Sequence, residues 1–509
     1  MCHSNRLKDR GRGQSLWYSP GLTAKSPGDT RHPPSMNQTP AKKPKLGYRL
    51  AQTIAQDIIA QGWQVGANLG RESELMNRYK VSRDPLREAL RILEWQGIAR
   101  PVPGPGGGLR VRKPAREAIV NLLRDYIQLS QIGLDDLMEA SRTLNSLALE
   151  LLAKTIDENG IAELERAVAA GKTLQDSLLA EAKHQIRVFA LISDLTRHPT
   201  LNLFIQPINE ILINRFDMTI PPSRETITRG KPSWVHMRDT VRALGRRDAA
   251  AAVSAMNRYL DHIDACLKEG DGIHASRDPV PFWVAQRKGG MAQELMYRLS
   301  ADIYRLSPGD RIGLEPELID RYQVSRSILR EAIRMLEFVG LVEQRKGRVG
   351  GLFAACANPA LVVAAVNIYM KHSGYHFLEL QDSKQAIEEK ATYLAALKLS
   401  ADEELVLAEL GRALRAADRE TFIPHAAKLI YFIANSAKNP IISLYLESIM
   451  EASIYTPLDS ATTDRLLQRV EDIKARLCRV ADAVGSRDAQ SAALAMVAYR
   501  RFITSLMAA

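Results

Sequence analysis

The chain has 509 residues, of which 46% are hydrophobic, so it holds enough apolar material for two to four domains and disorder throughout is excluded. Its formal net charge of +11 favours a polyanionic partner but does not separate nucleic acid from an acidic membrane surface. The longest apolar run, 360–370, is too short to span a bilayer, and the four cysteines form no CxxC pair. We therefore expect a cytoplasmic protein with no membrane association, disulfide framework or structural zinc site.

Residues 1–45 are expected to form a disordered basic arm. The first 50 residues contain ten Lys or Arg against two acidic residues, and they are rich in Pro, Gly and Ser. Met36 precedes a more ordinary start, so residues 1–35 are either a native arm or a mis-assigned leader. The sequence leaves both readings open.

The segment 46–113 has the pattern of three helices followed by a β-hairpin. Apolar residues recur at helical spacing before Gly62, a short helix begins near Glu72, and a third helix follows the N-cap residue Ser82. Two short apolar stretches within 98–111 flank a Gly-rich turn. This order is typical of a winged helix-turn-helix, whose last helix enters the major groove of DNA.

The rest of the chain alternates in the same way. Amphipathic helical segments without a strand signal fill 114–267, a Gly- and Pro-containing linker is expected over 268–288, a second head over 289–355, and more helices over 356–509. We expect a mainly α protein with two winged helix-turn-helix domains, each with a small β-hairpin wing, alternating with two all-α bundles of six or seven helices.

The alternation reflects an internal duplication. At a shift of 243 positions, Glu72–Gly97 aligns with Glu315–Gly340, and 16 of the 26 residues are identical. At a shift of 240, the stretch from Ala243 is echoed from Ala483. A period of about 240 residues is too long for a solenoid, so whole domains are duplicated.

The start of each third helix carries the candidate DNA contacts. Serine hydroxyls and helix N-terminal amides suit a phosphate, and arginines four residues apart suit guanine edges. A single occurrence of two arginines at this spacing usually marks only a solvent-exposed helix face. Here, however, the same Ser-Arg-x-x-x-Arg-Glu-Ala pattern occurs in both heads. The candidates are Ser82, Arg83 and Arg87 in the first head, and Ser325, Arg326, Ser327, Arg330, Lys346 and Arg348 in the second head and its wing.

Both heads resemble the DNA-binding domain of the GntR family. The resemblance rests on the Val-Ser-Arg-x-x-x-Arg-Glu-Ala pattern and the Gly-rich wing, at 66–111 and again at 309–354. The helical regions look like the FCD effector domains of the FadR branch. The resemblance implies a DNA-binding regulator, and it covers nearly all of the chain beyond residue 45.

The heads depart from the family pattern and from each other. Ser73 and Pro316 stand where the family often has a backbone-contacting Arg. Asp84-Pro85 in one head is replaced by Ser327-Ile328 in the other. The turn of the first wing, VPGPGGG, carries no charge, whereas the second carries Arg345, Lys346 and Arg348. We expect the heads to prefer different half-sites.

The resemblance also bears on ligands. Many FCD domains bind a metal through three histidines, but the matching positions are Phe189, Met237 and Tyr259 in one copy and Ile430, Leu477 and Tyr499 in the other. We therefore expect no metal and no other cofactor. The candidate effector contacts are Arg142 and Lys384, at the place of an inward-pointing family Arg that could hold a carboxylate, and the hydroxyls of Tyr259 and Tyr499.

The combined expectation is a sequence-specific DNA-binding transcriptional regulator, a repressor by the commoner family outcome, modulated by a small organic effector. Its partners are double-stranded DNA and that effector, and it is either a homodimer or an internal pseudo-dimer. The alternatives are a non-specific architectural DNA-binding protein and a regulator with degenerate effector domains. No nucleotide or metal signature such as GxxxxGK[ST] or HExxH supports an enzyme.

Overall fold

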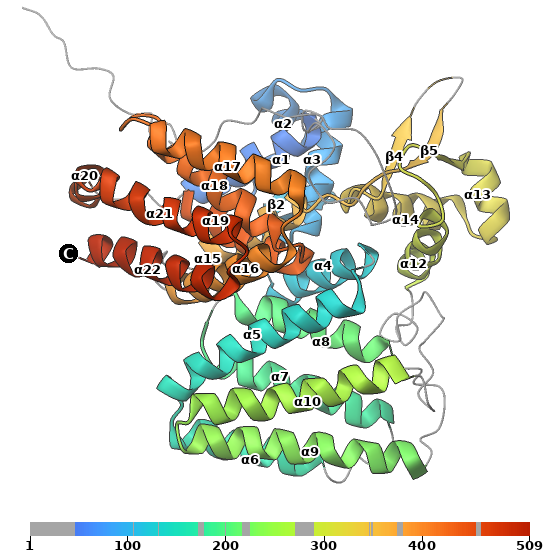
Figure 1. Ribbon diagram of the computed structural model, residues 1–509. Helices are drawn as coiled ribbons and strands as arrows, with labels where there is room; N and C mark the ends of the chain where they lie inside the picture. The colour runs from blue at the N-terminus through green and yellow to red at the C-terminus, as the bar shows by residue number, and fades with distance from the viewer. Residues whose placement is uncertain are drawn as a thin grey trace, which may run out of the picture. The chain divides into compact units, whose positions relative to one another are not determined.

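The computed structural model (Figure 1) describes twelve stretches of the chain, and these are residues 46–104, 106–113, 115–130, 132–171, 178–198, 200–215, 224–269, 290–345, 347, 350–373, 380–454 and 460–508. The expected basic arm, most of the expected linker, and the wing residues Lys346 and Arg348 lie outside these ranges. Among the described helices, none is both long and apolar enough to cross a membrane.

Each head contains the three expected helices and a wing. The first head consists of α1 (Leu46–Ala60), α2 (Glu72–Tyr79), α3 (Arg83–Trp95), β1 (Ala99–Val102) and β2 (Gly108–Val111). The second consists of α12 (Met291–Ile303), β3 (Arg311–Gly313), α13 (Glu315–Tyr322), α14 (Arg326–Phe338), β4 (Val342–Arg345) and β5 (Gly351–Ala354). The apolar stripes of α3 and α14 face their own heads, since Leu86 and Leu329 are fully buried.

The sheet of the second head contains a third strand, β3, that the sequence did not predict. β5 pairs antiparallel with β4 and with β3, giving the strand order β3-β5-β4. In the first head, the corresponding contact is only an isolated bridge between Asn68 and Arg110 beside the β1–β2 hairpin. A three-residue strand that ends at Gly313 is too short to leave an alternating pattern in the sequence.

The first helical domain contains seven helices among the described residues. They are α4 (Arg116–Leu129), α5 (Leu134–Thr155), α6 (Glu158–Gly171), α7 (Leu178–Leu195), α8 (Leu201–Asn214), α9 (Arg224–Gly245) and α10 (Ala249–Glu269). In Figure 1, α10 runs beside α9 and α5, and α4 lies on α8. Helix α10 continues two residues into the expected linker.

Eight helices are described in the second helical region, one more than expected. They are α15 (Ala360–His372), α16 (Gln381–Lys398), α17 (Ala401–Ala416), α18 (Phe422–Ser436), α19 (Pro440–Ile454), α20 (Ser460–Gln468), α21 (Val470–Gly485) and α22 (Ala489–Ala508). The additional helix arises because the stretch 460–485 is divided at Arg469 into two helices, α20 and α21. Arg469 has non-helical dihedral angles, with φ −109° and ψ 20°.

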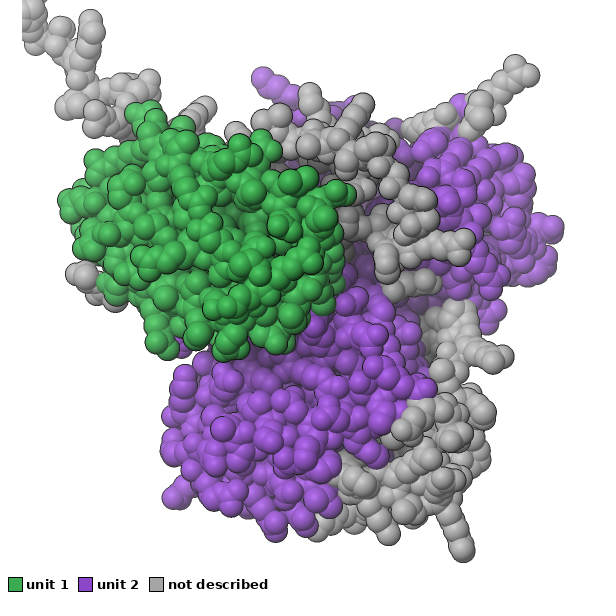
Figure 2. Space-filling view, in the orientation of Figure 1, with its two compact units in different colours: residues 1–33, 388–438, 450–509 green, residues 34–387, 439–449 purple. Residues whose placement is uncertain are grey.

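The residues form two compact units whose limits do not follow the duplication (Figure 2). The described part of unit 2 holds both heads, α4 to α10, α15, the start of α16, and Asn439–Ile449, which includes the first ten residues of α19. The described part of unit 1 holds the rest of the second helical region, and its core includes Leu407, Leu429 and Leu477.

Candidate DNA-binding surfaces and effector domains

The turn that sets the angle between the second and third helices is the same in both heads. Lys80 and Gln323 end α2 and α13 in the left-handed conformation, with φ values of 51° and 52°. Each preceding tyrosine ties this turn to the first helix: Tyr79 donates to Asp57 at 2.7 Å, and Tyr322 donates to Asp302 at 2.5 Å. The third helix of each head, the recognition helix, is therefore held at the same turn relative to the second.

The first recognition helix, α3, presents its two arginines on one solvent-facing side. Arg83 and Arg87 are exposed, and both direct their Nε atoms at one carboxylate oxygen of Glu72, at 3.2 Å and 2.8 Å. Ser82 is an exposed N-cap without a side-chain capping bond. Its hydroxyl and the first amides of α3 are therefore available to a phosphate.

The second recognition helix, α14, repeats this arrangement. Arg326 and Arg330 are exposed and place their Nε atoms 2.8 Å and 3.1 Å from the same oxygen of Glu315. Ser325 caps the helix by accepting from the Ile328 amide, and its hydroxyl lies 2.9 Å from that of Ser327. The predicted residues of this helix thus form one surface.

The two glutamates were missed by reasoning from the sequence. Glu72 and Glu315 begin α2 and α13, and each lies beside two arginines that follow it by 11 and 15 residues. Both belong to the block of 16 identities, which was the available signal. Arg83 and Arg87 contact Glu72 through their Nε atoms, whereas Arg330 also brings Nη2 within 3.3 Å of the second oxygen of Glu315. Each carboxylate thus fixes one side of its two guanidinium groups.

The described parts of the wings are held differently. Arg110 on β2 donates to the carbonyl oxygens of Gly66 and Gly106, both at 3.3 Å. In the second wing, the guanidinium of Arg345 lies over the ring of Phe353, 4.1 Å from its centre. The charged tip residues predicted for this wing fall outside the described residues.

Equivalent residues of the two recognition helices approach each other. Arg91 and Arg334 are separated by the repeat distance of 243. Partial burial, followed by the positive charge of Arg334, lowers the pKa of the Arg91 guanidinium. The two recognition helices are therefore near enough, at matching positions, for their charges to interact.

The structure corrects the placement of Arg142. Its guanidinium does not point into the bundle but pairs with Asp261 at 2.6 Å and Asp264 at 3.3 Å on α10. The inward position on α5 is Ser141, which is 1% exposed. At the repeat distance of 243, Ser141 rather than Arg142 corresponds to the buried Lys384. A one-residue error rotates a helical side chain by about 100°.

Tyr259 lies inside the first helical domain, in a hydrogen-bonded cluster. Its hydroxyl donates to Gln185 at 2.7 Å, Gln185 donates to Glu181 at 3.2 Å, and the Trp234 indole donates to the same Glu181 oxygen at 2.7 Å. Burial raises the pKa of Glu181, although both donors oppose the shift. The cluster thus holds a carboxyl group that burial shifts toward its neutral form.

The positions of the family's metal ligands are occupied by packed side chains. The rings of Phe189 and Tyr259 pack at a tilt of 57° with centres 5.4 Å apart, and Met237 is 1% exposed. Within the described ranges, no group of three or more His, Cys, Asp or Glu residues has the arrangement of a metal site. The residues present here do not fit a divalent ion.

The matching interior of the second helical domain contains an ion pair. Arg500 on α22 forms a two-pronged contact with Glu388 on α16, and both side chains are buried. Tyr499 lies beside this pair, and burial raises the pKa of its hydroxyl. At the repeat distance of 243, Glu388 corresponds to Asn145 in the first domain, so the two interiors differ in charge.

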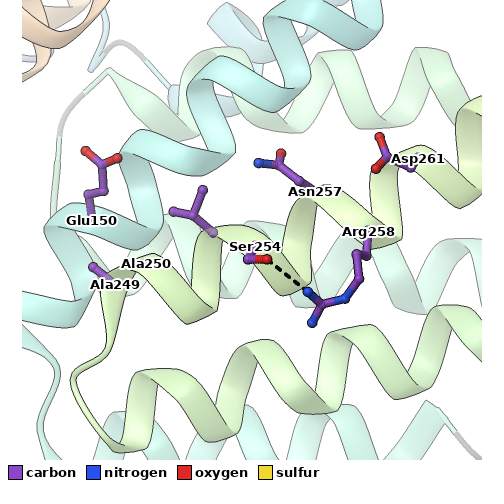
Figure 3. Close-up of a pocket in the computed structure, with 8 residues that line it drawn as sticks. Glu150, Ala249, Ala250, Ser254, Asn257, Arg258 and Asp261 are labelled. Atoms are coloured by element: carbon purple, nitrogen blue, oxygen red, sulfur yellow. Dashed lines mark hydrogen bonds between the residues drawn. The ribbon is translucent and has the colours of Figure 1, made fainter.

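A shallow depression of about 730 Å³ lies along α10 of the first helical domain (Figure 3). Its lining includes Ala250, Ser254, Asn257 and Asp261 from α10, with Glu150 contributed by α5. In Figure 3, Arg258 turns back along the helix and donates to Ser254 at 2.9 Å. The depression is open and does not contain the predicted effector contacts.

Two family models match the chain. The model described as "Bacterial regulatory proteins, gntR family" matches residues 46–108 and 291–350, one match in each head. The model described as "FCD domain" matches residues 136–262, which lie in the first helical domain. Each winged head and the first bundle thus coincide with a match.

Known relatives match part of this chain. The Exu regulon transcriptional regulator of Escherichia coli (strain K12) is 27% identical over 216 residues, which cover 40% of this chain and 78% of that protein. The Uxu operon regulator of Haemophilus influenzae is 32% identical over 123 residues, covering 24% of this chain and 42% of that protein. The solved structure titled Streptococcus agalactiae GntR is 21% identical, covers 44% of this chain and 99% of that chain, and gives a TM-score of 0.30.

Proposed function

We propose, starting from the premise that this chain is a GntR-family DNA-binding transcriptional regulator with an FCD effector domain, that both heads read one operator. The observation that carries the proposal is the repeated surface in which one glutamate aligns two exposed arginines on a recognition helix. A non-specific binder has no need of aligned guanidinium groups, because phosphate contacts alone supply its affinity.

Each head is proposed to use the same set of contacts. The serine hydroxyls and first amides of α3 and α14 hold a phosphate, while Arg83 and Arg87, or Arg326 and Arg330, reach base edges. The residue after the first arginine is Asp84 in one head and Ser327 in the other. A carboxylate there accepts from cytosine and repels phosphate, so we propose that the two half-sites differ in sequence.

The chain is proposed to act as an internal pseudo-dimer. In unit 2, Phe204 on α8 meets Tyr445 on α19 edge to face, with ring centres 4.9 Å apart, and the two residues correspond at a shift of 241, which aligns Pro199 with Pro440. Thr200 hydrogen-bonds the Tyr445 hydroxyl at 2.6 Å, and α4 packs on its counterpart α15. Like surfaces facing each other are what a two-fold dimer forms, but here one chain supplies both.

The effector is proposed to be a small organic metabolite that shifts the balance between two placements of the heads. The interior of the first helical domain is the favoured location, because among the described residues the hydrogen-bonded cluster of Tyr259, Gln185, Glu181 and Trp234 contains no ion pair like that of Glu388 with Arg500. At this location Arg142 is already paired with two aspartates, and the other candidate cation, Lys384, lies on α16 of the second helical region, so a carboxylate on the effector has no proposed anchor here. We further propose repression as the outcome of operator binding.

The test is selection of DNA fragments from a genomic pool by the purified chain at physiological salt, followed by footprinting of the selected site. We expect a discrete two-part site. Arg83→Ala with Arg87→Ala is expected to remove protection from one half, and Arg326→Ala with Arg330→Ala from the other. Enrichment of all fragments alike, with affinity that depends only on salt, would instead establish the architectural alternative.

A further inference from the structure

The second head is attached to the first helical domain by hydrogen bonds to a single carboxylate. On α12, the Tyr297 hydroxyl donates to Asp125 at 2.7 Å, and the Gln293 amide donates to the same carboxylate at 3.3 Å. Asp125 lies on α4, and Tyr297 is 1% exposed. A buried hydroxyl directed at a charged acceptor is among the stronger and more directional hydrogen bonds in proteins.

The carboxylate is in turn placed by a buried arginine. Arg124 precedes Asp125 on α4, and its Nε lies 3.8 Å from Asp125, while its Nη1 donates to Glu210 of α8 at 2.8 Å. Burial lowers the pKa of Arg124, but the charges of Asp125 and Glu210 more than offset this and raise it. The guanidinium therefore stays charged and bridges the two carboxylates.

The contacts continue across the domain. Gln206 donates to Glu210 at 2.9 Å, and Arg116 donates to Gln206 at 3.2 Å and to Asp194 of α7 at 3.0 Å. Helices α7, α8 and α4 are thus linked by polar side chains to α12 of the second head.

The carboxylate of this attachment is not repeated on α15, the counterpart of α4. At the repeat distance of 243, Asn367 and Ile368 on α15 stand in place of Arg124 and Asp125. The contact observed between the first head and α15 is instead aromatic, with the Trp63 and His372 ring centres 4.7 Å apart. The polar attachment therefore distinguishes the second head from the first among the described residues.

From these contacts we infer that Asp125, held by Arg124 and Glu210, is a positioning residue that fixes the orientation of the second head through Tyr297 and Gln293. The first helical domain thereby sets where the second head, rather than its own, meets DNA. The inference rests on the proposed function, because it concerns how two heads are placed on one operator. Fixing the head in advance removes an ordering cost that binding would otherwise bear.

The test compares operators that differ only in the spacing between half-sites. The probe is the site selected by the wild-type chain, together with versions carrying one and two extra base pairs between its halves. The variants are Tyr297→Phe, which removes only the hydroxyl, and Asp125→Asn, which removes the charge but keeps an acceptor. Tyr48→Phe is the matched control, since it removes a hydroxyl from α1 of the first head, where Gln52 is the donor.

We expect the wild type and Tyr48→Phe to prefer the selected spacing strongly. In Tyr297→Phe the preference should fall by about tenfold, the equivalent of one hydrogen bond to a charged group, and Asp125→Asn should fall in the same direction. The affinity for altered spacings should stay unchanged, and the first half-site should remain protected. A purely structural role would weaken binding at every spacing alike.

Two results would overturn the inference while leaving the proposed function intact. One is an unchanged spacing preference in both variants, and the other is an equal loss of affinity at all spacings. Failure of the wild type to select any site would instead refute the proposed function itself. The three results are separable in one set of binding curves.

Discussion

At the level of single residues, the two heads solve the same problem in the same way. In the proposed function, two arginines with flexible side chains present their planar ends to bases, and a shared glutamate reduces the freedom of both. The cost is a negative charge beside the phosphate backbone. Glu72 and Glu315 should therefore favour specificity at the expense of overall affinity.

Glu72→Gln is expected to raise affinity for non-specific DNA while lowering the ratio of specific to non-specific binding. Exposed ion pairs of this type are worth about 1 kcal/mol or less, so each change should be about fivefold or smaller. Titration with operator and random DNA at several salt concentrations measures both. Glu94→Gln, at the other end of α3, is the matched control, and an identical effect there would reduce the result to a change in net charge.

His372 gives the first head a pH-dependent contact. Burial, and then the nearby Lys113, lower the pKa of its imidazole below the ordinary 6.5. The unfolded chain therefore takes up this proton at a higher pH than the folded chain. The stability contributed by the neutral ring is present above about 6.5 and is lost as pH falls below it.

The expected result is a change in Trp63 fluorescence with a midpoint below 6.5, obtained as the difference between the wild type and Trp63→Phe. His372→Gln should abolish the transition. A midpoint at or above 6.5 would contradict the stated environment of the ring.

At the level of elements, the sequence was sufficient where periodicity is strong. The recognition helices carry one buried stripe each, and the duplicated block located the start of both to within a residue. Strand β3 and the break at Arg469 were not foreseeable, because short elements are decided by tertiary pairing rather than by local pattern. Arg142 was wrongly expected to point inward because the sequence alone does not show whether Ser141 or Arg142 faces the interior of the bundle.

The start of the second wing depends on Gly340. Its φ is +81°, and a Cβ there would lie 2.8 Å from the Asn358 amide nitrogen. Gly97 holds the matching place in the first head with φ +67°, but its Cβ would meet nothing closer than 3.7 Å. Gly97→Ala should cost only the conformational penalty of about 1–2 kcal/mol.

Gly340→Ala should cost more than Gly97→Ala, because the backbone of Asn358 must also move. Calorimetric unfolding of the two variants compares them directly. Equal losses of stability would show that the close approach at Asn358 relaxes freely.

The Glu388–Arg500 pair is expected to join α16 to α22 in the second helical domain. Glu388→Gln leaves a buried arginine without its counter-charge and should destabilise this domain by about 3–5 kcal/mol. The double variant Glu388→Leu with Arg500→Met removes both charges and should lose much less. Denaturant titration checks this, and equal losses in both variants would show that the pair is not effectively buried.

For the molecule as a whole, the duplication predicted the order of the domains but not the contacts that distinguish the two copies. Repeated motifs in the sequence revealed two heads and two helical regions, and the family matches agree for both heads and the first bundle. The functional differences between the two copies depend on single substitutions, such as Asp125 for Ile368 and Asn145 for Glu388. The effect of each substitution depends on contacts between segments that are distant in the sequence. No local pattern reports such contacts.

The central claim is that one chain provides both heads to one operator, with Phe204 and Tyr445 forming an interface between its two copies of the repeat. The most direct measurement is the mass of the complex between the purified chain and its selected two-part site, determined at concentrations near the dissociation constant. The account predicts one 56.6 kDa chain per DNA fragment, with both half-sites protected. Two chains per fragment, each protecting one half-site, would contradict it.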